Sequence, residues 1–183
     1  MCTLDLGDSI DLSAVADDDG SLWLLWKSDG NCCGIPTMMF GQPLSADGTE
    51  LAGPAVELLR NHRSWERDVV EAPSIIEVDC EYHLFYSANR RDTEAYAVGH
   101  AVCESIAGPC VKDPESWLAD TRATSGPGGL EVVEAPILGA VLVAYHGWTG
   151  DLVGYGDGGV RSLYAGPIRR VGGEPVLVER NAA

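Results

Sequence analysis

The sequence predicts an all-β protein of the β-propeller class, and three observations carry this prediction. A short motif recurs at a nearly constant spacing, each copy reads as a β-hairpin, and few stretches have the periodicity of a long amphipathic helix. Units of about four strands that repeat every ~40–60 residues are typical of propeller blades. We therefore expect about three blades in one partial propeller domain, residues 1–183.

The repeated motif is clearest in residues 10–26 and 70–86. The first copy reads IDLSAV, then DDDGS, then LWLLW, and the second reads VEAPSI, then EVDCE, then YHLFY. The two copies align without a gap at an offset of 60 positions, which pairs Asp11 with Glu71. A third copy begins with VEAPI at residues 133–137 and continues through a shorter turn into VLVAY at residues 141–145.

Each copy is interpreted as two strands around a tight turn. The sequence DDG at residues 18–20 predicts such a turn, because Asp and Gly tolerate positive φ. Apolar segments between the copies predict further strands at residues 37–40, 56–59, 96–103, 160–165 and 175–178. The Gly-rich segments at residues 125–129 and 154–159 are interpreted as loops.

The composition limits the class of partner. The net charge is −16, which argues against nucleic acid and against an anionic membrane surface, since both attract Lys and Arg. No apolar run approaches the ~18 residues of a membrane span. A neutral partner such as a sugar is compatible with this charge.

The cysteines give a second constraint. None of the six forms a C-x-x-C pair, which argues against a zinc site of that kind. The N-terminus shows no signal peptide. We interpret the thiols as unpaired, which favours a reducing location such as the cytoplasm.

Asp11 and Glu71 are the first candidates for chemistry. The first strand of each blade lines the central channel of a propeller, so these two acids are expected to face one cavity. Neighbouring carboxylates can divide acid–base work, because one negative charge disfavours ionisation of the other. The alternative is that both acids cap turns or lie in solvent.

The residues around these acids resemble glycoside hydrolase family 43. The sequences DSID (8–11), DDDG (17–20) and LLWK (24–27) resemble its second blade, although Leu12 stands where the family usually has proline. The third blade is resembled by VVEAPSI (69–75), LFYSAN (84–89), DT (92–93) and YAVG (96–99). The fourth is resembled by GPGG (126–129), AYHGW (144–148) and GGVRSLY (158–164).

The resemblance implies a five-bladed propeller of which the first blade is lacking. It also implies an inverting mechanism, with Glu71 as the general acid and Asp11 as the residue that tunes and orients it. The family's base would lie about one repeat before Asp11, where only ten residues precede. We therefore expect an incomplete catalytic set and no substantial turnover by this chain alone.

The resemblance further implies binding residues. Trp26, Asn89, Trp148 and Arg161 are expected to contact substrate, with packing between blades as the alternative for the aromatic rings and a salt bridge to a channel acid as the alternative for Arg161. His146 is expected to contact a central cation, often calcium, or water. A hydrogen-bonded core histidine remains equally open, because calcium prefers oxygen ligands. No cofactor is required.

The leading functional interpretation is a glycosidase that acts on α-L-arabinofuranosyl or β-xylosyl linkages of plant polysaccharides. The alternative is a non-catalytic carbohydrate-binding or remnant propeller that keeps the funnel without the base. A homo-oligomer is a further expectation, because open blade edges offer unpaired backbone groups.

Overall fold

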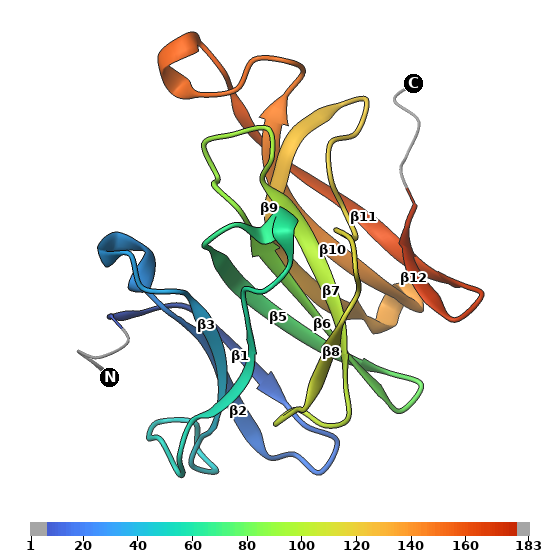
Figure 1. The fold of residues 1–183 in the computed structure, drawn as a ribbon. Coiled ribbons are helices and arrows are strands. Elements are labelled where there is room, and N and C mark those ends of the chain that lie inside the picture. The colour runs from blue at the N-terminus through green and yellow to red at the C-terminus, as the bar shows by residue number, and fades with distance from the viewer. Residues whose placement is uncertain (1–6, 179–183) are drawn as a thin grey trace.

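The computed structural model describes residues 7–178, which form three antiparallel sheets of four consecutive strands each (Figure 1). The N-terminal blade contains β1 (Ser9–Ala16), β2 (Leu22–Ser28), β3 (Met38–Pro43) and β4 (Val56–Arg60). The middle blade contains β5 (Val70–Val78), β6 (Glu81–Ala88), β7 (Ala97–Cys103) and β8 (Cys110–Lys112). The C-terminal blade contains β9 (Thr124–Ala135), β10 (Ala140–Thr149), β11 (Arg161–Val171) and β12 (Glu174–Leu177). The predicted all-β propeller with three blades is confirmed.

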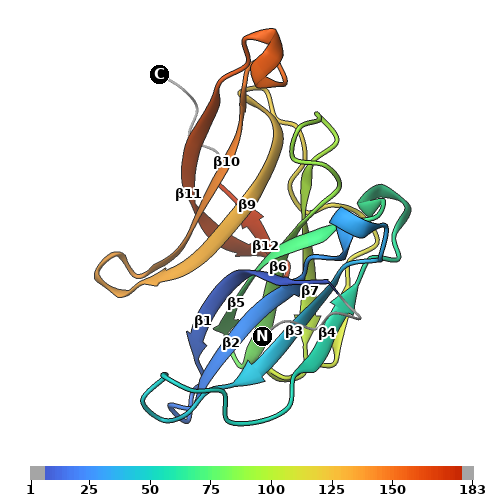
Figure 2. The ribbon, with the colours of Figure 1, turned by 90° about the vertical axis from the view of Figure 1, so that its left-hand side faces the viewer.

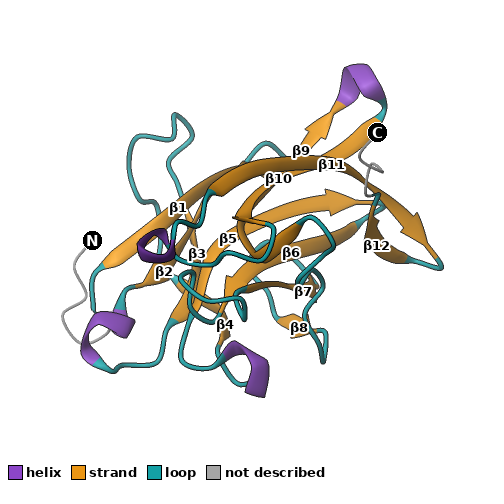
Figure 3. Ribbon diagram, turned by 90° about the horizontal axis from the view of Figure 1, so that it is seen from above, coloured by secondary structure: helices purple, strands orange, loops and turns teal. Residues whose placement is uncertain are grey.

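Helix is confined to short connections (Figure 3). The described part of the chain contains four 3-10 turns, which are η1 (Gly30–Cys33), η2 (Ser64–Glu66), η3 (Pro136–Leu138) and η4 (Tyr155–Asp157). Among residues 7–178, no helix has the length and apolar character that a membrane span requires.

The core lies in two layers, one on each face of the middle blade. Leu84 and Tyr86 of β6 pack toward the N-terminal blade, against Leu25 and its neighbours. Phe85, which lies between them in the sequence, packs toward the C-terminal blade with Val143. Successive side chains of a strand point to opposite faces, so a strand buried on both sides must be apolar without interruption. This explains the continuous apolar run LFY in β6.

The inner strands β1, β5 and β9 lie beside one another (Figure 2). The pairing register shifts between Ile10 and Ser13 in β1 and between Glu71 and Ser74 in β5. Each shift marks a β-bulge, which bends a strand and turns its side chains. These bulges place the candidate acids at one end of the channel strands.

The bulges also correct the sequence alignment of the first two copies. Asp11 (φ 55°) and Ala72 (φ 52°) occupy the same bulge position. Asp11 is therefore equivalent to Ala72, and its predicted equivalence to Glu71 is wrong by one residue. The error arises because the turn between β5 and β6 is one residue shorter than the turn between β1 and β2.

The third copy was placed incorrectly as well. Glu134 pairs with Val141 at the hairpin end of the C-terminal blade, so residues 133–135 end the inner strand instead of beginning it. The bulge position in β9 is filled by Gly129, which has φ 60°. The glycines predicted to form a loop at residues 125–129 thus lie inside β9.

A buried ion pair fixes the connection between the N-terminal and middle blades. The Glu66 carboxylate lies 2.6 Å from Lys112 Nζ and accepts hydrogen bonds from the Tyr86 hydroxyl and the His62 and Arg63 N–H groups. Burial alone would raise the pKa of Glu66, but Lys112 and these donors hold the pKa below its ordinary value. These contacts hold the segment between β4 and β5 against the middle blade.

The cysteines differ from expectation. Cys103 of β7 and Cys110 of β8 form a disulfide between neighbouring strands, and Cys80 is a free, exposed thiol. The interpretation of all six thiols as unpaired is therefore wrong. It no longer supports a reducing compartment.

Candidate functional site

Glu71 lies at the start of β5, with a carboxylate that is held from two sides. The Tyr96 hydroxyl donates a hydrogen bond of 2.5 Å to Oε1, and Lys27 Nζ lies 3.5 Å from Oε2. The Glu71 side chain retains 18% exposure. The carboxyl group is thus fixed by charged and hydrogen-bonding partners while solvent still reaches it.

Asp11 approaches the same place from the neighbouring blade. Its carboxylate Oδ2 accepts a hydrogen bond of 3.0 Å from the backbone N–H of Ala72. Ala72 directly follows Glu71, so Asp11 holds the bulge that orients Glu71. The structure therefore brings the two predicted acids together at adjoining blades.

Lys27 was missed as a site residue at the level of sequence. It lies near the end of β2, and its side chain is fully buried. Nζ donates a hydrogen bond of 2.8 Å to Asn31 Oδ1 and lies 3.4 Å from Asp29 Oδ1. A buried lysine needs partners, because an isolated buried charge is very costly. The signal available in the sequence was a charged residue directly after the apolar run LWLLW.

Tyr96 was also missed, and it links Glu71 to His146. Burial and then the Glu71 carboxylate raise the pKa of Tyr96 well above its usual value, so the phenol stays protonated as a donor. Its ring stacks on His146 with 6.4 Å between centroids. Two glycines make the room: a Cβ added to Gly128 would lie 1.9 Å from Tyr96 Cε1, and one added to Gly129 would lie 2.3 Å from His146 Nε2.

His146 is paired with Arg161. Arg161 Nε donates a hydrogen bond of 2.9 Å to His146 Nδ1. Arg161 Nη1 donates one of 2.6 Å to the backbone carbonyl of Arg91. Burial and then the guanidinium charge lower the pKa of His146, so the imidazole is neutral and accepts. The guanidinium carbon also lies 5.1 Å from the centroid of Trp148. Arg161 is therefore held by His146 and by a backbone carbonyl. These partners take the place of the salt bridge to a channel acid that was its alternative expected role.

Three expected binding residues lie beneath the site surface. Trp26 is buried and stacks on Phe40 at 4.4 Å, and Trp148 is equally buried. Asn89 donates from Nδ2 to the Trp65 carbonyl at 3.0 Å. In this arrangement the two indole rings pack within and between blades, and Asn89 shapes the loop after β6.

A resident calcium ion at His146 does not fit the residues present. Nδ1 already accepts from a guanidinium, which leaves only Nε2 as a ligand. Within residues 7–178, no group of three His, Cys, Asp or Glu side chains at metal-ligand distances includes His146.

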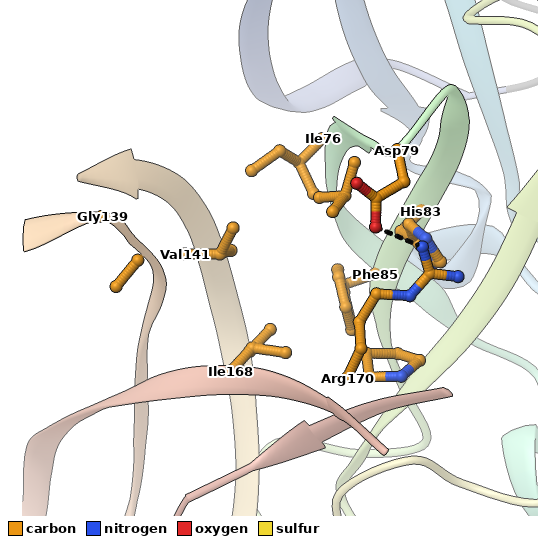
Figure 4. Close-up of a pocket in the computed structure, with 11 residues that line it drawn as sticks. Ile76, Asp79, His83, Phe85, Gly139, Val141, Ile168 and Arg170 are labelled. Atoms are coloured by element: carbon orange, nitrogen blue, oxygen red, sulfur yellow. Dashed lines mark hydrogen bonds and ion pairs between the residues drawn. The ribbon is translucent and has the colours of Figure 1, made fainter. Parts of the chain in front are cut away.

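Two cavities lie toward the opposite end of the strands. One of about 630 Å³ runs between β1, β5 and β9 and is lined by acids that include Glu77 and Glu131. Another of about 310 Å³ lies between the middle and C-terminal blades (Figure 4). Glu131 of β9 accepts a hydrogen bond of 3.4 Å from the Ser13 hydroxyl of β1. Neither cavity includes Asp11 or Glu71.

Comparison with known proteins places these features in context. The family model described as glycosyl hydrolases family 43 matches residues 2–168. Among curated proteins, none matches this chain.

Solved structures share the fold. A thermostable family-43 glycoside hydrolase is 26% identical with a TM-score of 0.83, and the match covers 96% of this chain and 59% of that one. An endo-1,4-beta-xylanase from Bacteroides thetaiotaomicron VPI-5482 is 23% identical with a TM-score of 0.80, covering 95% and 60%. An alpha-L-arabinofuranosidase from Lactobacillus brevis is 20% identical with a TM-score of 0.77, covering 96% and 58%. The chain therefore spans about three fifths of the length of these relatives.

Proposed function

Because this chain belongs to glycosyl hydrolases family 43, we propose that it serves the hydrolysis of α-L-arabinofuranosyl or β-xylosyl linkages in plant polysaccharides, with Glu71 as the general acid. The observation that carries the proposal is the position of the Glu71 carboxylate, which is held by Tyr96 and Lys27 beside Asp11 and yet is open to solvent. A general acid must be reachable by the leaving oxygen and held in one orientation.

In this mechanism Glu71 donates its proton to the glycosidic oxygen as the bond to the sugar breaks. Tyr96, which stays protonated, keeps one carboxyl oxygen oriented, and Lys27 approaches the other. Asp11 is a positioning residue that acts through the Ala72 N–H. Inversion would also require a general base that activates water on the opposite face of the sugar, and we assign no residue to that role.

The test compares Glu71→Gln with the parent on two substrate types, in a form of the protein that hydrolyses them. Poor leaving groups, as in arabino- and xylo-oligosaccharides, should lose about 10²–10⁴-fold in kcat/KM, the usual contribution of general acid–base help. Activated aryl glycosides should lose much less, because their leaving groups need little protonation. Equal loss on both substrate types, or no loss on oligosaccharides, would contradict the role of Glu71.

Glu134→Gln is a matched control for this experiment. Glu134 stands in the same Val-Glu-Ala-Pro sequence as Glu71, but the residue is exposed at the hairpin end of its blade. The variant should keep the parent activity. A loss equal to that of Glu71→Gln would show a charge effect that is not specific to the site.

A second candidate function is carbohydrate binding without turnover, the alternative that the sequence left open. Calorimetric titration with the same oligosaccharides separates the two. Binding without hydrolysis supports this second candidate, and hydrolysis that depends on Glu71 supports the first. If the chain shows neither binding nor hydrolysis, both candidate functions are overturned.

A further inference from the structure

A cluster of metal-ligating side chains lies at the junction of the middle and C-terminal blades, away from Glu71. His100 lies in β7, Asp113 directly follows β8, and Glu174 begins β12. One ligand atom from each residue lies within 4.8 Å of the others, and His100 Nδ1 is 2.8 Å from Asp113 Oδ2. His100 and Asp113 lie in and directly after neighbouring strands of the middle blade, and Glu174 comes from the C-terminal blade.

This donor set is one imidazole nitrogen and two carboxylates, which zinc accepts in proteins. Zinc bonds of 2.0–2.2 Å at tetrahedral angles separate ligand atoms by about 3.3 Å. The exposed Glu174 side chain needs only a small rotation to reach that distance, while buried His100 and half-buried Asp113 are already close. A fourth position would remain for water.

The residue behind His100 supports this interpretation. His100 Nε2 lies 3.0 Å from His83 Nδ1, and a metal-bound histidine nearly always has such a partner on its other nitrogen. His83 is only 4% exposed and lines the 310 Å³ cavity (Figure 4). Among the described residues, its Nε2 has no hydrogen-bond partner.

We propose that His100, Asp113 and Glu174 bind a divalent transition-metal ion such as Zn²⁺, which joins the outer strand of the C-terminal blade to the middle blade. The site uses no cysteine, so the absence of C-x-x-C pairs does not bear on it. It is separate from the proposed glycosidase site and does not depend on activity.

The arrangement predicts a proton shift at a residue that the metal does not touch. Without metal, His100 Nδ1 donates to the Asp113 carboxylate, and His100 Nε2 accepts from His83 Nδ1. With metal on Nδ1, the proton of His100 sits on Nε2 and is donated to His83 Nδ1. The proton of His83 then sits on Nε2.

The first measurement is calorimetric titration of the chelator-treated chain with Zn²⁺. Every protein carries Cys80→Ser, because the exposed thiol would also bind zinc. One zinc per chain is expected. Glu174→Gln and Asp113→Asn should bind zinc at least about tenfold more weakly than the parent. Glu115→Gln, which removes an exposed charge close to Asp113 in the sequence, should bind as the parent does. Absence of stoichiometric binding, or equal binding by Glu174→Gln, overturns the proposal.

The second measurement is the ¹⁵N NMR spectrum of the histidine rings. Zinc should convert His83 from the form with its proton on Nδ1 to the form with its proton on Nε2, and Glu174→Gln should require a higher zinc concentration for the same change. Glu174 is exposed, so this variant is expected to fold normally. Unchanged His83 and His100 signals at zinc saturation would place the metal elsewhere and overturn the assignment.

Discussion

The carboxylate of Asp11 accepts a hydrogen bond from the N–H of Ala72, 61 residues later in the chain. This one contact joins the bulges of two neighbouring inner strands and places Asp11 beside Glu71. A carboxylate that accepts from a backbone N–H forms a charge-assisted bond, which is stronger than a neutral one. The candidate site is thus held together by a contact between blades.

The first prediction concerns this contact. Asp11→Ala should lower kcat on oligosaccharides with little change in KM, because the bulge that orients Glu71 loses its acceptor. Asp11→Asn keeps an acceptor oxygen and should restore part of the lost kcat. Steady-state kinetics of the three proteins provide the check. A change in KM alone, or equal kcat values for Asp11→Asn and Asp11→Ala, would contradict a positioning role.

The second prediction concerns the space beneath Tyr96 and His146. Gly129→Ala adds a Cβ that would lie 2.3 Å from His146 Nε2 at φ 60°. Positive φ costs roughly 1–2 kcal/mol for a non-glycine residue, and overpacking adds roughly 1–3 kcal/mol. Gly139→Ala is the matched control, because φ is 57° there and the added Cβ meets open space. Urea denaturation should show a clearly larger loss for Gly129→Ala than for the control.

The third prediction concerns the buried pair at the blade junction. Lys112→Met leaves the buried Glu66 carboxylate without its cation and should lower the free energy of unfolding by about 3–5 kcal/mol. Arg90→Met removes an exposed partner of Asp92 and should change stability very little. Denaturation curves for both variants test the contrast. Similar effects of the two substitutions would show that burial does not decide the strength of these pairs.

The fourth prediction concerns pH. Burial lowers the pKa of both His83 and His146 below the value of about 6.5 that the unfolded chain has. The unfolded state therefore binds more protons as pH falls. The stability that the neutral rings provide is complete above pH ~6.5 and decreases below it. Thermal unfolding between pH 7.5 and 5.5 should show this decrease, with a shallower slope for His146→Gln. Constant stability across that range would contradict the prediction.

The sequence predicted the hairpins of the first two blades because turn residues and apolar runs are local signals. It failed at β9, where glycine and proline were interpreted as a loop. In the structure, Gly128 and Gly129 lie in a strand because Tyr96 and His146 occupy the space that side chains would need. That requirement comes from residues 17 to 32 positions away, which no local pattern contains.

The candidate site was predicted in part. Glu71 and Asp11 were found through the repeat, although the register was wrong by one residue. Lys27 and Tyr96 were interpreted as parts of strand motifs, because the sequence does not reveal that one ends beside Glu71 and the other donates to it. Trp26 was expected to face a sugar, but Phe40 covers its ring. Side-chain direction at strand ends depends on bulges, which the alternation pattern alone does not locate.

The pairing of consecutive strands within each sheet bears on how the chain folds during synthesis. Each blade needs only hairpins between neighbours, so loop-closure entropy is small and a blade can form soon after its last strand leaves the ribosome. The hydrogen bond between Ser13 and Glu131 spans 118 residues and cannot form before the C-terminal blade is made. In ribosome-bound chains from which only the N-terminal and middle blades have emerged, the amides of β1–β8 should therefore already be protected from exchange. The side of the channel that β9 lines forms later.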